Sequence, residues 1–132
     1  MHQKRILFVD DDEIQVYILS NLTQKLSQGV EFISVDNGFA AIEYLKTCNG
    51  NYPDLILLDL NMPIMDGFGF LDIYERDFLP FRPLAKVVML TSSVRDEDKK
   101  KSVNYKSIYA FYNKPIKITE YKELLEIIEP QP

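Results

Sequence analysis

The chain has 132 residues, of which 46% are hydrophobic and 27% charged, and 15 Lys and Arg residues against 20 Asp and Glu residues give a net charge of −5. This size and composition predict one soluble globular domain with a real hydrophobic core, and the negative charge argues against a nucleic-acid-binding protein. No apolar run reaches the roughly 18 residues of a membrane span, and the four apolar residues after Lys4-Arg5 are too few for a signal peptide, so we expect a cytoplasmic protein without membrane contact. Because Cys48 is the only cysteine, we expect neither an internal disulfide nor a thiolate metal cluster.

The first half of the chain predicts two strands and two helices. Ile6–Val9 is an uninterrupted apolar run, typical of a strand covered on both faces. A helix follows, with apolar positions near a 3.6-residue period at Ile14, Tyr17, Ile18, Leu22 and Leu26. Capping explains one or two of the acids before this helix, whereas three consecutive aspartates exceed what capping needs. A strand over 30–35 and a second helix after Asp36-Asn37-Gly38 come next, the latter with Ala41, Ile42 and Leu45 inward.

The second half predicts three more strands, each followed by a helix. The strands are Leu55–Leu58, Lys86–Leu90 and Ile108–Tyr112. Asp66 is the expected cap of the third helix, a Ser93–Asp96 capping box is expected for the fourth, and Thr119 is expected to cap the fifth. The fourth helix is mostly polar, with the pairs Asp96–Lys100 and Glu97–Lys101 on its surface and Val94, Val103 and Tyr105 as its buried candidates. The inward stripe of the fifth helix is Tyr121, Leu124, Leu125 and Ile128.

Five strands alternating with five helices predict an α/β fold, a single doubly wound (βα)5 domain over residues 1–132 with a parallel sheet and helices on both faces. Right-handed crossovers leave few topologies, and the flavodoxin-like strand order 2-1-3-4-5 fits best.

Four of the five predicted strands end in residues able to do chemistry. Asp10 and Asp11 follow the first strand, Asp59 the third, Thr91 the fourth and Lys114 the fifth. Because the carboxyl ends of parallel strands share one edge of the sheet, these side chains should converge. Carboxylate oxygens suit Mg²⁺, an ammonium can hold a phosphoryl oxygen, and a hydroxyl can donate to another.

With these residues in this order, the chain resembles the receiver domains of bacterial two-component response regulators over nearly its whole length. The segments that carry the resemblance are Val9-Asp10-Asp11, Leu58-Asp59, Met62-Pro63, Asp66-Gly67, Thr91-Ser92 and Lys114-Pro115. The resemblance implies that Asp59 accepts a phosphoryl group from a histidine kinase or a histidine phosphotransfer protein. It also implies that Asp11, Asp59 and the backbone carbonyl of Asn61 bind Mg²⁺, with Asp10 acting through water.

The resemblance further assigns the switching residues and the output surface. Lys114 and Thr91 would contact the phosphoryl oxygens, and Thr91 would move together with an aromatic residue of the fifth strand, here Phe111. Many relatives carry tyrosine there, so a step that needs a phenolic hydroxyl is unavailable, and a plain core role for Phe111 stays open. The face made by the fourth helix, fifth strand and fifth helix would bind a downstream partner protein, and Lys114-Pro115 would be cis.

Two other functions compete with a signalling switch that catalyses only its own phosphorylation and dephosphorylation. A haloacid-dehalogenase-type aspartyl-phosphate phosphatase also places an aspartate after an apolar strand, but it needs a second acid two residues later, where this chain has Asn61. A flavin-binding module lacks its phosphate loop here, since the segment 10–13 is wholly acidic. We expect a stand-alone receiver, with a receiver excised from a longer hybrid protein as the alternative.

Overall fold

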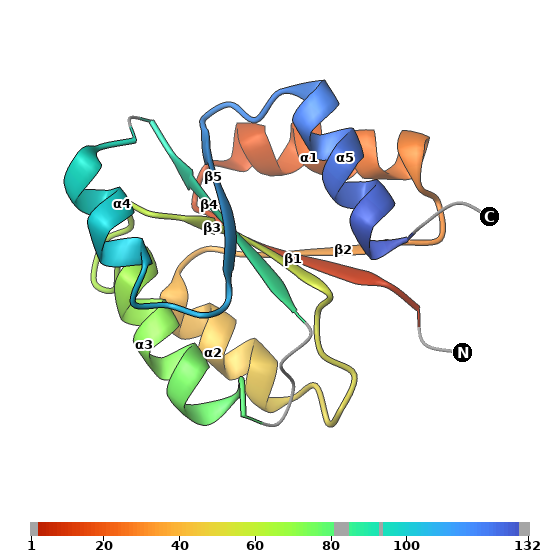
Figure 1. Cartoon of the computed structure of the whole chain (residues 1–132). Helices are drawn as coiled ribbons and strands as arrows, with labels where there is room; N and C mark the ends of the chain where they lie inside the picture. Colours follow the sequence, from red (N-terminus) through yellow and green to blue (C-terminus); the bar gives the residue numbers. More distant parts are fainter. Residues whose placement is uncertain (1–2, 81–84, 93, 130–132) are drawn as a thin grey trace.

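The computed structural model describes residues 3–80, 85–92 and 94–129, in which strands and helices alternate along the chain (Figure 1). The strands are β1 (Arg5–Val9), β2 (Glu31–Val35), β3 (Leu55–Asp59), β4 (Lys86–Thr91) and β5 (Ile108–Asn113). The helices are α1 (Glu13–Leu26), α2 (Gly38–Lys46), α3 (Gly67–Asp77), α4 (Asp96–Ser102) and α5 (Ile118–Ile128). All neighbouring strands pair in parallel in the order β2-β1-β3-β4-β5, which confirms the predicted topology.

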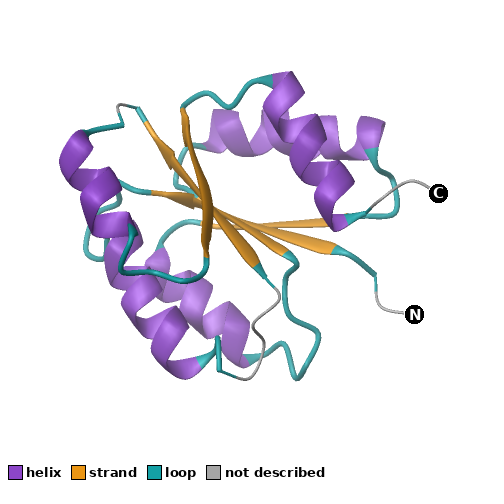
Figure 2. Cartoon of the chain, in the orientation of Figure 1, coloured by secondary structure: helices purple, strands orange, loops and turns teal. Residues whose placement is uncertain are grey.

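The sheet lies between two layers of helices, with α1 and α5 on one face and α2 and α3 on the other (Figure 2). Alternate residues of each central strand serve the two layers: Leu7 packs with the α2 and α3 side, whereas Ile6 and Phe8 pack with α1 and α5. Because successive side chains of a strand point to opposite faces, a strand covered on both faces must be apolar throughout. This requirement explains the uninterrupted apolar runs of β1 and β3. Within the part of the chain that the structure describes, no helix is long and apolar enough to cross a membrane.

The α1 stripe differs from the prediction. Leu19 and Thr23 are buried, and Val16 and Leu22 pack beside them, whereas the side chains of Ile14 and Tyr17 are 70% and 71% exposed. Ile18 and Leu26 are also exposed. The apolar residues of this helix fall on two sides, and only one side meets the sheet. Polar Thr23 fits the buried side because its hydroxyl group bonds the carbonyl of Leu19 and the hydroxyl of Tyr121 on α5.

Two predicted helix starts are also wrong. Helix α4 begins at Asp96 with Arg95 as its N-cap, so Asp96 is its first residue instead of its third, and Ser93 lies outside the described residues. Helix α5 begins at Ile118, one residue before the predicted cap, and Glu120 accepts the N–H of Lys117 at 2.9 Å. A side-chain acceptor three residues ahead replaces the expected threonine cap.

The surface of α4 differs from the prediction as well. Arg95 pairs with Glu97 and Asp98, and Lys101 lies over the ring of Phe68, so the expected Glu97–Lys101 pair is replaced by other contacts. Val103 is 82% exposed instead of buried. The stripes predicted for α2 and α5 are confirmed, and the buried residues of these helices include all those expected there: Ala41, Ile42, Leu45, Tyr121, Leu124, Leu125 and Ile128.

Candidate functional site

The strand register brings four chemically active positions to the carboxyl edge of the sheet. Asp59 is the last residue of β3 and pairs with Leu90 of β4, and Thr91 ends β4 one residue later. Asp10 directly follows β1, and Lys114 directly follows β5. The backbone N–H of Lys114 donates to the carbonyl of Thr91 at 2.8 Å, which extends the β4–β5 ladder to this lysine. The convergence predicted from the sequence is confirmed.

Three carboxylates form the floor and rim of this site. One oxygen each from Asp10, Asp11 and Asp59 lies within 4.8 Å of the other two. Asp10 and Asp59 are 1% and 5% exposed, whereas Asp11 is exposed at the rim. Two buried anions side by side are costly without a neutralising cation, and an all-oxygen donor set suits a hard divalent ion. The donor chemistry and spacing therefore fit Mg²⁺.

The cation present at the site is the ammonium of Lys114. Its Nζ lies 2.7 Å from Asp10 Oδ2 and 3.3 Å from Asp59 Oδ2. Burial by itself lowers the pKa of Lys114, but the bond to Asp10 and the charge of Asp59 outweigh it, so the pKa is raised and the ammonium stays charged. Burial also raises the pKa of Asp59, an effect that Lys114 opposes and the charge of Asp10 reinforces.

The other oxygen of each buried aspartate organises the adjoining loop. Asp10 Oδ1 accepts the N–H of Asp12 at 2.9 Å, and Asp59 Oδ1 accepts the N–H of Asn61 at 3.1 Å. Such side-chain-to-backbone bonds two residues ahead fix tight turns. Each carboxylate thus shapes its own loop with one oxygen and contacts Lys114 with the other.

Asp12 has a role that sequence reasoning left unassigned. It is the N-cap of α1, and its Oδ1 accepts from the N–H groups of Ile14 and Gln15 at 3.0 and 3.3 Å. The signal was present in the sequence, since aspartate directly before a helix is a preferred cap. The three consecutive aspartates therefore divide into two site residues and one structural cap.

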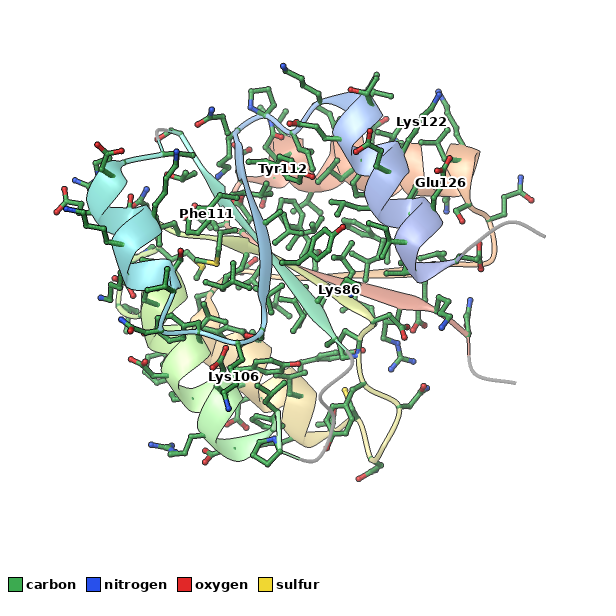
Figure 3. The ribbon with its side chains drawn as sticks, viewed as in Figure 1. Lys86, Lys106, Phe111, Tyr112, Lys122 and Glu126 are labelled. Atoms are coloured by element: carbon green, nitrogen blue, oxygen red, sulfur yellow. The ribbon has the colours of Figure 1, made fainter. Side chains whose placement is uncertain are left out.

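Thr91 ends β4, and Phe111 lies on the neighbouring strand β5. Thr91 is buried, and its Oγ1 accepts from Asn61 Nδ2 at 3.4 Å. Phe111 is partly buried and packs with the core on the α3 side, while its neighbour Tyr112 packs with the α5 side. Figure 3 shows the two aromatic side chains on opposite sides of β5. The peptide bond between Lys114 and Pro115 is cis, as expected.

Two positions near the start of α3 are unusual: Gly67, the first residue of α3, packs closely against the site, and Ile64 in the preceding loop has a left-handed backbone. A Cβ on Gly67 would lie 2.9 Å from Met89 Cε and 3.1 Å from the carbonyl oxygen of Asp59, so the start of α3 can lie this close to the site only with glycine. Ile64 is 87% exposed and has φ of 72°, a left-handed conformation that costs a β-branched residue about 1–2 kcal/mol. The first residue of α3 is therefore closely packed, and the loop before it is strained at Ile64.

A doubly wound sheet that gathers carboxylates, a hydroxyl and an ammonium at one edge defines a phosphoryl-accepting switch domain. The response regulator receiver domain model matches residues 6–126, and the chain belongs to this family. Among curated proteins, it is 35% identical over 123 residues to hybrid signal transduction histidine kinase L of Dictyostelium discoideum, covering 92% of this chain and 7% of the kinase. It is 33% identical over 94 residues to the response regulator VraR of Staphylococcus saprophyticus, covering 71% of this chain and 42% of VraR.

Solved structures give the same result. A two-component response regulator from Cytophaga hutchinsonii superposes with a TM-score of 0.85 at 25% identity, covering 99% of this chain and all of that one. A two-component response regulator from Legionella pneumophila gives a TM-score of 0.83 at 28% identity, covering 97% and 99% of the two chains. The chain spans less than a tenth of the first kinases that it matches. A receiver domain fits a phospho-acceptor signalling switch, and the comparisons give no support to a dehalogenase-type phosphatase.

Proposed function

We propose that Asp59 is the phospho-acceptor and that its donor is the phosphohistidine of a histidine kinase or phosphotransfer protein. The observation that carries this proposal is the position of the Asp59 carboxylate, at the base of the acidic site and in contact with Lys114. In the transfer a carboxylate oxygen of Asp59 forms a P–O bond while the P–N bond to the donor imidazole breaks. The product is an acyl phosphate, which attacking water can hydrolyse.

The same proposal assigns Mg²⁺ to Asp11, Asp59 and the backbone carbonyl of Asn61, with Asp10 held through water. The ligand spacing in the acidic cluster supports this set, and the exposure of Asp11 gives the ion a route in from solvent. When bound, Mg²⁺ neutralises charge on the phosphoryl oxygens. The protein's own contribution is to position the nucleophile and to provide fixed positive charge and donors around it.

Lys114 and Thr91 supply that charge and one donor. The ammonium of Lys114 contacts both buried carboxylates. It can therefore exchange its contact with the Asp59 carboxylate for a contact with an oxygen of a phosphoryl group on Asp59. Thr91 is the last residue of the neighbouring strand β4, and its hydroxyl group donates to a second phosphoryl oxygen. Movement of Thr91 opens space that Phe111 takes up, which passes the change to β5 and the face formed by α4, β5 and α5. A downstream partner protein reads this face.

The rim of the site offers an apolar surface for a protein donor. Asp59 is nearly buried, so a phosphohistidine reaches it only if the donor sits directly on the rim. Large apolar side chains are exposed there, among them Ile14 and Ile18 in the first turns of α1 and Ile64 in the loop after β3. Their burial by the donor would favour the complex. The strained backbone of Ile64 supports this role, since such strain concentrates at functional sites.

The proposal also covers the extent of the domain and its place in the cell. Residues 1–132 act as one receiver domain, and the domain works in the cytoplasm, where the free thiol of Cys48 stays reduced. The domain catalyses only its own phosphorylation and dephosphorylation.

Incubation with acetyl phosphate and Mg²⁺ tests the acceptor. The intact mass should rise by one phosphoryl group in the wild type and in the matched control Asp77→Asn, and Asp59→Asn should abolish the rise. Phosphorylation that persists in Asp59→Asn would overturn the assignment. Steady turnover of a small phosphate ester would favour the phosphatase instead. Asp11→Ala should weaken Mg²⁺ binding measured by calorimetry, and unchanged affinity would remove Asp11 as a ligand.

A further inference from the structure

Helix α4 has few contacts of its own with the rest of the domain. It spans seven residues, of which only Asp98 is buried. Side-chain burial is the main source of helix stability in proteins, so a helix this short and polar does not hold its position alone. The segment from the end of α4 to the start of β5, residues 101–107, passes beside α3 (Figure 1).

A stripe on α3 binds this segment. The stripe consists of Phe68, Asp72 and Glu75, which are four and three residues apart and therefore share one face of the helix. The ring of Phe68 stacks on Tyr105 with centroids 5.5 Å apart, and the ammonium of Lys101 lies 4.7 Å from the same ring. The first member of the stripe thus contacts both the last turn of α4 and the turn that follows it.

The two acidic members bind polar groups of the same segment. Asp72 Oδ1 accepts the hydroxyl of Tyr105 at 2.7 Å. Glu75 accepts the backbone N–H of Lys106 at 3.1 Å, and both the N–H and the hydroxyl of Ser107, the former at 2.8 Å. Carboxylates bound to two successive backbone N–H groups fix the chain direction, and bonds to charged acceptors are stronger than neutral ones. Figure 3 shows Lys106 next to α3, where β5 begins.

The stripe is attached to the phosphorylation site at both ends. Helix α3 starts directly after the loop that follows Asp59, and the N–H of Gly67 bonds the carbonyl of Leu60 at 2.9 Å. On the other side, Ser107 directly precedes β5, and Lys114 directly follows that strand. A strand is a stiff connection, so the position of its first residues restricts the position of the residue at its end.

We propose that Phe68, Asp72 and Glu75 form a latch that holds α4 and the start of β5 in the arrangement in which Lys114 contacts Asp10 and Asp59. A phosphoryl group on Asp59 draws Lys114 away from these carboxylates and so works against the latch. The latch therefore sets how readily the α4–β5–α5 face changes. This inference rests on the proposed role of Asp59 and of that face.

Linkage gives the latch a measurable consequence. If the latch opposes the arrangement that a phosphoryl group favours, weakening it must tighten the binding of a phosphoryl mimic. Tyr105→Phe removes one hydroxyl and keeps the ring stacked on Phe68, so it weakens the latch without opening a cavity. Glu75→Gln keeps the side-chain length but replaces one acceptor oxygen with a donor.

The experiment measures beryllofluoride affinity in the presence of Mg²⁺, together with hydrogen exchange over residues 95–108. Both variants should exchange this segment roughly tenfold faster than the wild type and bind beryllofluoride several-fold more tightly. The matched controls are Tyr17→Phe on α1 and Asp77→Asn on α3, which leave the stripe intact and should match the wild type.

The outcomes are separable. Faster exchange with unchanged beryllofluoride affinity would show that the stripe is a structural support only, and would overturn the latch. Unchanged exchange in both variants would overturn it as well. A wild type that binds no beryllofluoride at all would instead refute the proposed function of Asp59.

Discussion

Replacing Lys114 with methionine should destabilise the fold because it leaves two buried carboxylates without their cation. Methionine retains an apolar stem of similar length but carries no charge. Asp10 and Asp59 are only 1% and 5% exposed, and the ammonium of Lys114 lies 2.7 and 3.3 Å from their carboxylates. In the variant these two carboxylates would lie side by side without that ammonium. Breaking a buried ion pair by removing one partner costs about 3–5 kcal/mol, and the 20% exposure of the Lys114 side chain places this case at the lower end, about 3 kcal/mol.

The deficit should depend on pH and on Mg²⁺. Lys114 lowers the pKa of Asp59 against the raising effect of burial, so its removal moves that pKa further above the usual value. A native-state pKa above the unfolded value means that the native state gains protons first, so stability rises as the pH falls through that pKa and is lost as the pH rises through it. The loss relative to the wild type should therefore be largest near neutral pH and shrink in acid. Mg²⁺ should also reduce it, because the proposed ion site consists of these native carboxylates.

Urea unfolding at several pH values, with and without Mg²⁺, measures this effect. Lys99→Met is the control, because Lys99 is exposed on α4 and the same change of residue type should shift stability by no more than about 0.5 kcal/mol. The reasoning is refuted if Lys114→Met matches the control near neutral pH. It is also refuted if its deficit is the same in acid or in saturating Mg²⁺.

Three further predictions address the acceptor, the loop and the rim. Asp59→Asn should stabilise the fold near neutral pH by more than about 0.5 kcal/mol, because burial raises the pKa of Asp59 and its ionised form is costly. Thermal unfolding should show that this gain disappears as the pH falls below the ordinary pKa of aspartate. A loss of stability in the variant would contradict the prediction. Ile64→Gly should raise stability by about 0.5–1 kcal/mol, since relief of the left-handed strain exceeds the entropy cost of glycine, and calorimetry showing destabilisation would remove the strain argument. Ile14→Ser should slow phosphotransfer from a protein donor while acetyl phosphate labelling of Asp59 stays unchanged; equal slowing with both donors would place the defect in the pocket instead of the rim.

Much of the site was predictable because the fold class follows from local patterns. Apolar runs such as Leu55–Leu58 identify strands covered on both faces, and alternation with helices then requires a parallel sheet. Once the sheet is parallel, residues that follow the strands must meet at one edge. The grouping of Asp10, Asp59, Thr91 and Lys114 therefore needed no knowledge of side-chain packing.

The helix surfaces were less predictable because a period alone does not show which side meets the sheet. On α1, Ile14 and Tyr17 fit a helical stripe as well as Leu19 does, yet the stripe with Leu19 and Thr23 is the buried one. The choice depends on a partner distant in sequence, Tyr121, whose hydroxyl group satisfies that of Thr23 inside the core. A pattern read along one helix does not contain that partner.

The sequence by itself determined the fold class and the identity of the residues at the carboxyl edge, because uninterrupted apolar runs identify strands covered on both faces and their alternation with helices requires a parallel sheet. Only the tertiary structure decided how the charges pair and how α4 is held. The contacts of Lys114 with two carboxylates, and of Glu75 with Lys106 and Ser107, join residues more than thirty positions apart. Such contacts depend on the distances between folded elements, and no local pattern in the chain specifies those distances.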